Sequence, residues 1–103
     1  MTKLSVIIPA YNEEKTIIKV IDKVKNLQLK NISKEIIIVD DCSEDNTRSI
    51  LKNIDDNSLK ISFHKKNMGK GAAIKTGLKI STGDIILIQD ADLEYDPKEY
   101  EKL

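Results

Sequence analysis

The stretch "ILIQDADLEYDP", residues 86–97, joins an apolar run to a dense group of acidic residues. The apolar run is typical of a buried β-strand. Asp90 and Asp92 follow it one residue apart, and two more acids come before the proline that turns the chain. Four carboxylates within seven residues repel one another, so they need either open solvent or a bound cation. The stretch therefore predicts a buried sheet element that ends in a polar site.

The composition is that of one small α/β domain. At 103 residues the chain buries about two-thirds of the surface that its unfolded form exposes. Its 17 basic and 17 acidic residues balance, which argues against bulk electrostatic attraction to nucleic acid or to an anionic membrane. A single cysteine, Cys42, excludes an internal disulfide, and neither a signal-peptide pattern nor an apolar run of membrane-spanning length occurs. We therefore expect a soluble, cytoplasmic domain that binds no nucleic acid.

Four short runs rich in Ile and Val predict parallel strands. They are "LSVII" (4–8), "EIIIVD" (35–40), "LKISFH" (59–64) and "DIILIQ" (84–89). The second and fourth runs are apolar on successive residues, as strands covered on both faces should be.

Apolar stripes between these runs predict three helices, the first of which begins near Asn12 and Glu13. The stripes repeat at spacings of three and four, as one face of a helix does. Their residues are Ile17, Val20, Ile21, Val24 and Leu27 in the first helix, Ile50, Leu51 and Ile54 in the second, and Ala73, Ile74 and Leu78 on the inner side of the third, which runs from about Lys70 to Ile80. The order is therefore β-α-β-α-β-α-β. Because crossovers between parallel strands are right-handed, we expect an open, doubly wound parallel sheet of the Rossmann-like type.

The segments that follow the four strands are all polar. They are "PAYNEE" (9–14), "DDCSEDNT" (40–47), "HKKNMGKG" (64–71) and "DADLE" (90–94). In open α/β sheets ligands bind at the carboxyl ends of the strands, near the point where the strand order reverses. Ordinary turn chemistry accounts for any one of these segments, but four of them together predict a binding site.

Four segments, in this order, carry a resemblance to a known family. They are "SVIIPAYNEE" (5–14), "IIIVDDCSEDNT" (36–47), "NMGKGAAIKTGL" (67–78) and "GDIILIQDADLEYDP" (83–97). Together they resemble the nucleotide-sugar-binding half of glycosyltransferase family 2, which has the GT-A fold, over essentially the whole chain. The last two resemble most closely the branch that contains the dolichol-phosphate mannose and polyprenyl-phosphate glucose synthases. The resemblance implies inverting transfer of a sugar from a UDP- or GDP-sugar to an acceptor, in this branch a polyprenyl or dolichyl phosphate.

The acidic group has a chemical explanation in this setting. Mg²⁺ and Mn²⁺ prefer carboxylate, phosphate and water oxygens, and Asp90 and Asp92 point to the same side of an extended segment. The resemblance implies that Asp90 lies near the ribose and the metal, that Asp92 is the main metal ligand and that Glu94 assists. A bound metal would stabilise the leaving diphosphate. The alternative is a solvated acidic turn in which Asp96 caps a helix that begins at Pro97.

The resemblance assigns the nucleoside pocket to the first two strand ends, namely to Pro9, Ala10, Tyr11, Glu13, Val39 and Asp41. A carboxylate such as Asp41 accepts a hydrogen bond from a base N–H group, and Tyr11 supplies a flat wall. In the alternative interpretation, Asn12 and Glu13 only begin the first helix, and Asp40 and Asp41 only end the second strand.

The third segment predicts a diphosphate contact. Gly69 and Gly71 allow the backbone to approach a ligand closely, and the start of the third helix favours an anion. Lys70 then reaches a phosphate, although a solvated lysine explains the same residue. The spacing is not that of a Walker loop. His64, a single histidine without a partner motif, is expected to end the third strand and to bind no ligand.

Residues 1–103 are therefore expected to form the donor-binding half of a GT-A domain, cut after the Asp-x-Asp strand. The acceptor-binding half and its general base are missing, so no catalytic residue is assigned and activity of the chain alone is not expected. The fourth strand then becomes an apolar sheet edge, and we expect the chain to self-associate through that edge or through the uncovered helix faces. With a lipid-phosphate acceptor, the full-length enzyme would act at the cytoplasmic membrane surface.

Two other functions stay open at this point. A nucleotidyltransferase shares this kind of sheet but has a Gly-rich, basic loop after the first strand, which "PAYNEEKT" (9–16) lacks. A non-catalytic nucleotide-binding or interaction module fits the missing acceptor half. The sequence names neither the sugar nor the base of the nucleotide.

Overall fold

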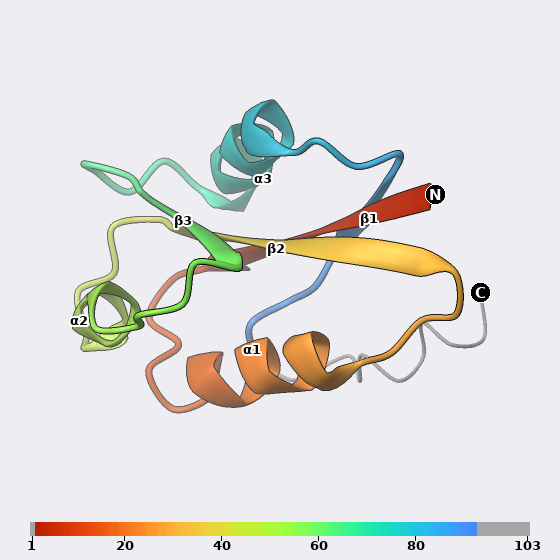
Figure 1. Cartoon of the computed structure of the whole chain (residues 1–103). Coiled ribbons are helices and arrows are strands. Elements are labelled where there is room, and N and C mark those ends of the chain that lie inside the picture. Colours follow the sequence, from red (N-terminus) through yellow and green to blue (C-terminus); the bar gives the residue numbers. More distant parts are fainter. Residues whose placement is uncertain (1, 93–103) are drawn as a thin grey trace.

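The computed structural model of the chain describes residues 2–92, in which four strands alternate with three helices (Figure 1). The strands are β1 (Thr2–Ala10), β2 (Ile32–Asp40), β3 (Leu59–Phe63) and β4 (Ile85–Ile88). The helices are α1 (Ile17–Asn26), α2 (Thr47–Lys52) and α3 (Lys70–Ile80). This is the alternating order that the sequence predicts.

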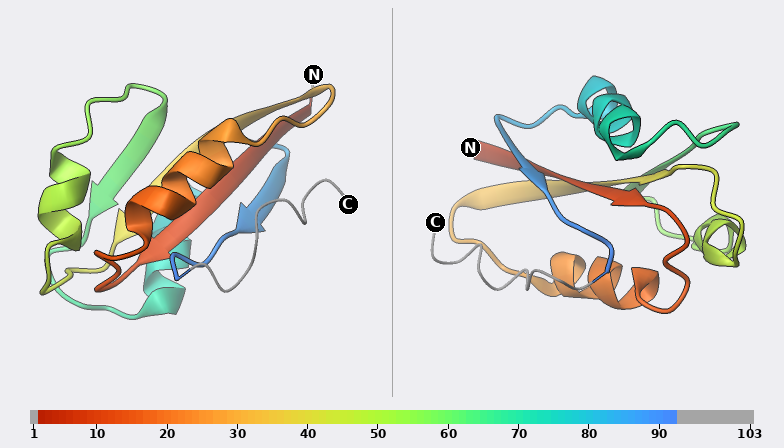
Figure 2. Two further views of the ribbon diagram at one scale, coloured as in Figure 1. Left: turned by 90° about the horizontal axis from the view of Figure 1, so that it is seen from below. Right: turned by 180° about the vertical axis from the view of Figure 1, so that it is seen from behind.

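The strands form one parallel sheet in the order β3-β2-β1-β4. β1 lies inside the sheet, paired along its whole length with β2 and over a shorter stretch with β4. α1 and α2 cover one face of the sheet, and α3 covers the other (Figures 1 and 2). The sheet is thus open and doubly wound, which confirms the predicted fold class.

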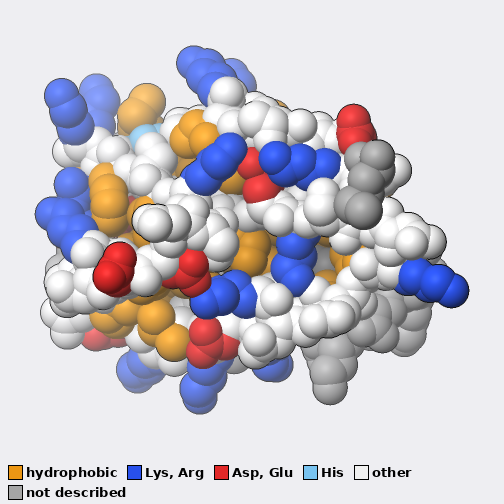
Figure 3. All heavy atoms as spheres, in the orientation of Figure 1, with side chains coloured by type: hydrophobic (Ala, Val, Ile, Leu, Met, Phe, Trp, Pro, Cys, Tyr) orange, Lys and Arg blue, Asp and Glu red, His pale blue; other side chains and the backbone are white. Residues whose placement is uncertain are grey.

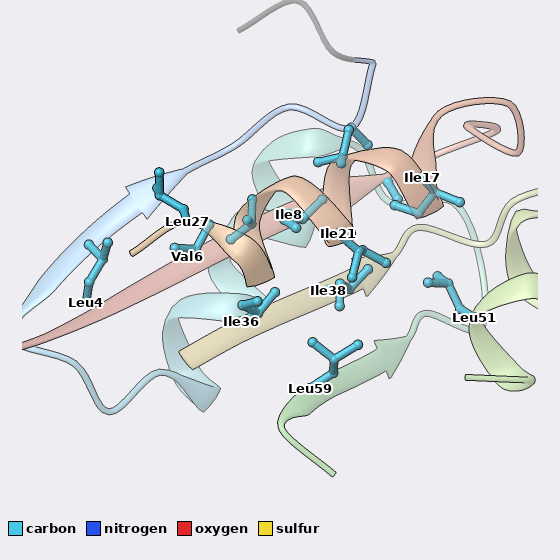
Figure 4. Packing of buried hydrophobic residues seen from close by; sticks show 14 residues of the cluster. Leu4, Val6, Ile8, Ile17, Ile21, Leu27, Ile36, Ile38, Leu51 and Leu59 are labelled. Atoms are coloured by element: carbon cyan, nitrogen blue, oxygen red, sulfur yellow. The ribbon is translucent and has the colours of Figure 1, made fainter. Parts of the chain in front are cut away.

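Two apolar layers hold the helices to the sheet. On the α1 side the strands contribute Val6, Ile8, Ile36 and Ile38, which face Ile17 and Ile21 of the helix (Figure 4). On the α3 side Ile7, Ile37 and Val39 pack with Ala73. Successive residues of β1 and β2 therefore enter opposite layers, which explains why these strands are apolar without interruption. Each such buried side chain stabilises the fold by about 1.5–3 kcal/mol.

α1 begins at Ile17, later than the sequence predicts. Asn12 has a φ of 55°, a left-handed backbone conformation that excludes it from a right-handed helix. A turn forms first, in which the amides of Thr16 and Ile17 both donate to the carbonyl of Glu13. The predicted apolar stripe is confirmed, because its members are buried: Ile17, Val20, Ile21, Val24 and, just past the helix end, Leu27.

α3 turns a different stripe to the sheet than the sequence predicts. Ala73 and Gly77, four residues apart, are buried, whereas Leu78 is 45% exposed, so the prediction for Leu78 is wrong. The reason is a close helix-to-strand approach: a Cβ atom on Gly77 would lie 2.6 Å from Cγ2 of Ile7 in β1. Two small residues on one face let α3 lie directly on the sheet and rotate Leu78 outward.

β4 is an edge strand with an apolar surface. Ile85, Ile86 and Ile88 are 47%, 38% and 37% exposed. Within residues 2–92 no strand lies beyond β4, so the prediction that this run is buried on both faces is wrong for the described residues, in which it forms an exposed edge.

Both kinds of charge occur on the face shown in Figure 3, where Lys and Arg side chains lie beside Asp and Glu side chains, in line with the balanced composition. None of the helices within residues 2–92 has the length and apolarity needed to span a bilayer.

Candidate functional site

A cavity of about 360 Å³ opens at the carboxyl edge of the sheet, where β1 and β4 end. The strand order reverses between these two strands, because α3 carries the chain from β3 across the sheet to β4. Open α/β sheets bind their ligands at such a switch point. All four polar segments contribute to the walls, which consist of Pro9, Ala10, Tyr11, Glu13, Asp41, Asn67, Gly69, Lys70, Ala73, Asp90, Ala91 and Asp92.

The structure brings together most of the residues that the family resemblance implies. All of those expected at the nucleotide line the cavity except Val39. Val39 is fully buried in the apolar layer beneath α3, because residues of a strand alternate between the faces of the sheet and Val39 shares its face with Ile37. Of the expected metal ligands, Asp90 and Asp92 line the cavity, and Glu94 lies outside the described residues.

The first two loops are joined by hydrogen bonds that depend on the left-handed conformation of Asn12. Oδ1 of Asn12 accepts from the amides of Glu44 and Asp45, the Asn12 amide donates to Oγ of Ser43, and the Glu13 amide donates to Oγ1 of Thr47, at distances of 2.8–3.3 Å. Tyr11, 40% exposed, is held between these loops at the rim of the cavity. The hydrogen bonds therefore join the two loops at the rim of the cavity.

Two adjacent acids at the end of β2 have different surroundings. Asp40 is fully buried, accepts hydrogen bonds from the amide and hydroxyl of Ser43, and lies 3.8 Å from the Arg48 guanidinium. It therefore fixes the loop and does not line the cavity. Asp41 lines the cavity because the chain turns at Cys42, whose φ is 60°.

Asp41 joins the third loop to the sheet. Its Oδ1 accepts from Nδ1 of His64 and from the amide of Met68, and its Oδ2 accepts from the amide of Gly69, each at 2.8 Å. Burial opposes ionisation of Asp41, but the hydrogen bonds from Met68, His64 and Gly69 outweigh it and lower the pKa of the carboxyl below its usual value. The cavity thus contains a fixed negative charge at neutral pH.

An ion pair lies across the cavity from Asp41. Nζ of Lys70, in the first turn of α3, is 2.5 Å from Oδ1 of Asp90, and the two side chains are 60% and 20% exposed. Asp92 lies beside them at the end of β4 and is exposed. The start of α3 favours an anion, and Gly69 before it adopts a φ of 95° that only glycine tolerates well. This side of the cavity therefore presents both a cationic group, Lys70, and anionic groups, Asp90 and Asp92, to a bound ligand.

Asp90 and Asp92 suit a metal ion whose other coordination positions are filled by a bound ligand. Among residues 2–92, no three His, Cys, Asp or Glu side chains gather into a closed metal site. Mg²⁺-type ions that bind with phosphates use one or two carboxylates and fill their other positions with phosphate and water oxygens. Asp90 already takes a cation, the Lys70 ammonium, on one oxygen. Asp90 and Asp92 are thus suited to hold a divalent ion against a diphosphate.

Sequence reasoning missed His64. It is 9% exposed, and its two ring nitrogens contact Asp41 and, at 2.8 Å, Oγ1 of Thr76. The contact follows from strand register, which local sequence patterns do not contain: Asp40 pairs with Phe63, so the next residues, Asp41 and His64, leave the sheet side by side. Of the other lining residues, Gly69 was expected near the ligand, Asn67 and Ala91 belong to segments already singled out as strand exits, and Ala73 comes from the inner face of α3.

The sequence matches the family described as Glycosyl transferase family 2 over residues 5–103. An undecaprenyl-phosphate 4-deoxy-4-formamido-L-arabinose transferase of Proteus mirabilis is 35% identical over 107 aligned residues, which cover 100% of the chain and 33% of that relative. A dolichol-phosphate mannosyltransferase of Pyrococcus furiosus is 33% identical over 102 residues, which cover 98% of the chain and 29% of that relative. The chain thus spans about a third of the length of these curated relatives.

Solved structures agree with this match. The chain resembles residues 1–349 of S. aureus TarS in complex with UDP, with a TM-score of 0.73 and 36% identity over 87% of the chain and 27% of that TarS chain. It also resembles the mannosyltransferase PcManGT from Pyrobaculum calidifontis in complex with GDP-Man and Mn²⁺, with a TM-score of 0.69 and 28% identity over 88% of the chain and 28% of that protein.

Proposed function

The chain belongs to glycosyl transferase family 2, and on this basis we propose that its cavity binds the nucleotide-sugar donor of a glycosyltransferase. One observation carries the proposal. Residues from all four strand ends, each expected at the donor from its motif, line a single cavity at the switch point of the sheet. Membership of this family also argues against the alternative of a nucleotidyltransferase.

The diphosphate lies, in this proposal, between Lys70 and the acidic pair. Asp90 and Asp92 hold a Mg²⁺ or Mn²⁺ ion, which when bound neutralises the leaving diphosphate as a Lewis acid. Lys70 presents its ammonium to the phosphates, and the amide groups at the start of α3 add partial positive charge. The similar protein PcManGT was solved with GDP-Man and Mn²⁺, which supports a divalent ion together with the donor.

The nucleoside occupies the other side of the cavity. Pro9, Ala10 and Tyr11 provide its apolar wall, and Glu13 lies within reach of the ribose in this arrangement. Asp41 accepts a hydrogen bond from the base. The hydrogen-bonded junction between the first two loops orients these groups in advance, which lowers the entropy that donor binding costs.

We assign residues 1–103 to the donor-binding half of the GT-A domain. The acceptor is a polyprenyl phosphate, by analogy with the relatives named for undecaprenyl phosphate and dolichol phosphate. Such an acceptor places the enzyme at the cytoplasmic membrane surface. The general base that an inverting transfer requires is assigned to no residue of this chain.

Calorimetric titration of UDP and GDP into the chain tests the proposal, with Mn²⁺ and with EDTA. We expect binding that needs the metal, that weakens by about tenfold or more in Asp92→Asn, and that is unchanged in Asp22→Asn, which alters an exposed acid on α1. Circular dichroism shows whether each protein is folded. A folded chain that binds neither nucleotide with Mn²⁺ would contradict the proposal, as would equal loss in both variants.

A further inference from the structure

The hydrogen bonds to Asp41 do not use every acceptor position of its carboxylate. Each oxygen of an ionised carboxyl group accepts about two hydrogen bonds. Oδ1 of Asp41 already accepts two, from His64 and Met68, whereas Oδ2 accepts one, from Gly69. Asp41 is only 3% exposed and lines the cavity, so one acceptor position on Oδ2 remains for a ligand there.

His64 keeps Oδ1 occupied. Asp41 can only accept, so Nδ1 of His64 carries the proton and Nε2 meets the hydroxyl of Thr76, which donates or accepts as required. The backbone of His64 is fixed as well, since its amide donates to the Asp40 carbonyl and its own carbonyl accepts from Arg48. The ring is therefore anchored at the ends of β2 and β3 and on α3.

We propose that this saturated Oδ1 makes the cavity select uracil over guanine, so that the donor is a UDP-sugar. The inference rests on the proposed donor site and names its base. Uracil offers one ring N–H, which a single acceptor position satisfies. Guanine offers two adjacent donors, the ring N1–H and the exocyclic amine, which need both oxygens of a carboxylate. With Oδ1 filled, one guanine donor stays unpaired in a buried site, which costs about tenfold or more in affinity.

Titrations of the wild-type chain separate the effect of the number of hydrogen-bond donors on the base from the effect of its size. UDP, GDP and inosine diphosphate are titrated with Mn²⁺ by calorimetry. Hypoxanthine, the base of inosine, is a purine like guanine but lacks the exocyclic amine, so it presents the single N–H that Oδ2 can accept. We expect UDP to bind about tenfold or more tightly than GDP, and inosine diphosphate to bind more tightly than GDP.

Two matched substitutions test the role of His64 as a positioning residue. In His64→Asn the amide nitrogen takes the place of Nδ1 and still donates to Oδ1, so the ratio of UDP to GDP affinity stays as in wild type. In His64→Gln the amide takes the place of Nε2, Oδ1 gains a free acceptor position, and GDP binding improves relative to inosine diphosphate. A merely structural histidine would weaken all three nucleotides alike.

The outcomes separate this inference from the proposed function. GDP bound as tightly as UDP, or more tightly than inosine diphosphate, would overturn the selection of uracil and leave the donor site intact. Binding of no nucleotide to the folded chain would overturn both. An unchanged order of affinities in His64→Gln would assign the selectivity to groups other than His64.

Discussion

The ion pair between Lys70 and Asp90 is expected to affect the binding of both the metal ion and the diphosphate. The ammonium lies 2.5 Å from a carboxylate oxygen of the proposed metal site, so Lys70 would compete with a divalent ion in the absence of a diphosphate. In the proposed complex the diphosphate oxygens would attract the same ammonium and make the carboxylate available. The ion pair is therefore expected to suppress metal binding by the empty site and to favour binding of metal and nucleotide together.

Lys70→Met tests this competition. We expect Mn²⁺ alone to bind a few-fold more tightly, because Asp90 loses its competing cation, while UDP with Mn²⁺ binds about tenfold more weakly, because a charged contact to the phosphates is lost. Electron paramagnetic resonance of free Mn²⁺ measures the first affinity, and calorimetry measures the second. Lys79→Met, in the last turn of the same helix, serves as the control. Parallel changes in both affinities would contradict the competition.

Glu35 is a second residue whose charge matters, here for stability. It is 7% exposed in the amino-terminal half of the sheet, and accepts from Oγ of Ser5, Nζ of Lys60 and the amide of Thr82 at 2.5–2.8 Å. Burial opposes its ionisation, but these donors outweigh burial and hold the pKa of Glu35 at about 2, below its usual 4.5. Because the folded pKa is the lower one, the stabilisation is complete above 4.5 and is lost as pH falls toward 2.

We therefore expect Glu35→Gln to lower the free energy of unfolding by roughly 2–3 kcal/mol at pH 7. The difference from wild type should shrink as pH falls from 4.5 toward 2, which urea unfolding at several pH values measures. Asp56→Asn is the comparison: hydrogen bonds from Lys25 and Ser58 also hold the pKa of Asp56 at about 2, but its side chain is 24% exposed, so solvent screens the charge and a smaller loss is expected. A difference between Glu35→Gln and wild type that does not vary with pH would show that the lost charge is not its cause.

At the scale of elements, the contact of α3 with the sheet depends on Gly77. Glycine inside a helix costs about 1 kcal/mol relative to alanine, so its presence needs a packing reason. A Cβ at this position would lie 2.6 Å from Cγ2 of Ile7 and 3.2 Å from two further atoms of the same side chain. Ile7 is fully buried, so it has little room to move.

Gly77→Ala should accordingly lower the free energy of unfolding by about 1–2 kcal/mol, because overpacking outweighs the gain in helix propensity. Gly71→Ala, in the first turn of the same helix, should leave stability unchanged or raise it by up to ~1 kcal/mol, since a Cβ there meets no atom within 4 Å. Thermal and urea unfolding measure both. A stabilised Gly77→Ala protein would mean that α3 moves away from β1 at little cost.

Most elements could be predicted from the sequence, because period and order suffice for them. Short apolar runs identified the strands, although successive apolar residues did not separate the inner strand β2 from the edge strand β4, and the convergence of strand ends located the cavity. The start of α1 and the inner face of α3 could not be predicted, since the first depends on the backbone conformation of Asn12 and the second on close packing at Gly77. Contacts between distant residues, such as His64 with Asp41, require strand register, which local patterns do not contain.

At the scale of the whole molecule, the described sheet has two strands on one side of β1 and one on the other. β2 and β3 continue the sheet beyond β1 in one direction, whereas β4 ends it in the other within the described residues. An edge strand presents unpaired N–H and C=O groups along its free side, and three isoleucines of β4 are more than a third exposed. Two copies related by a twofold axis would pair their β4 strands in antiparallel fashion and extend the sheet.

We therefore predict that the chain self-associates through β4. Light scattering should give a mean mass that rises with protein concentration, and Ile86→Lys should return it to the monomer mass of 11.6 kDa, because a charge on the edge opposes pairing. Ile18→Lys is the matched control: Ile18 is 40% exposed, as Ile86 is 38% exposed, but it lies on α1. If Ile18→Lys abolishes association and Ile86→Lys does not, the contact is made by a helix face. A mass that stays monomeric at every concentration would show that the β4 edge does not pair between copies.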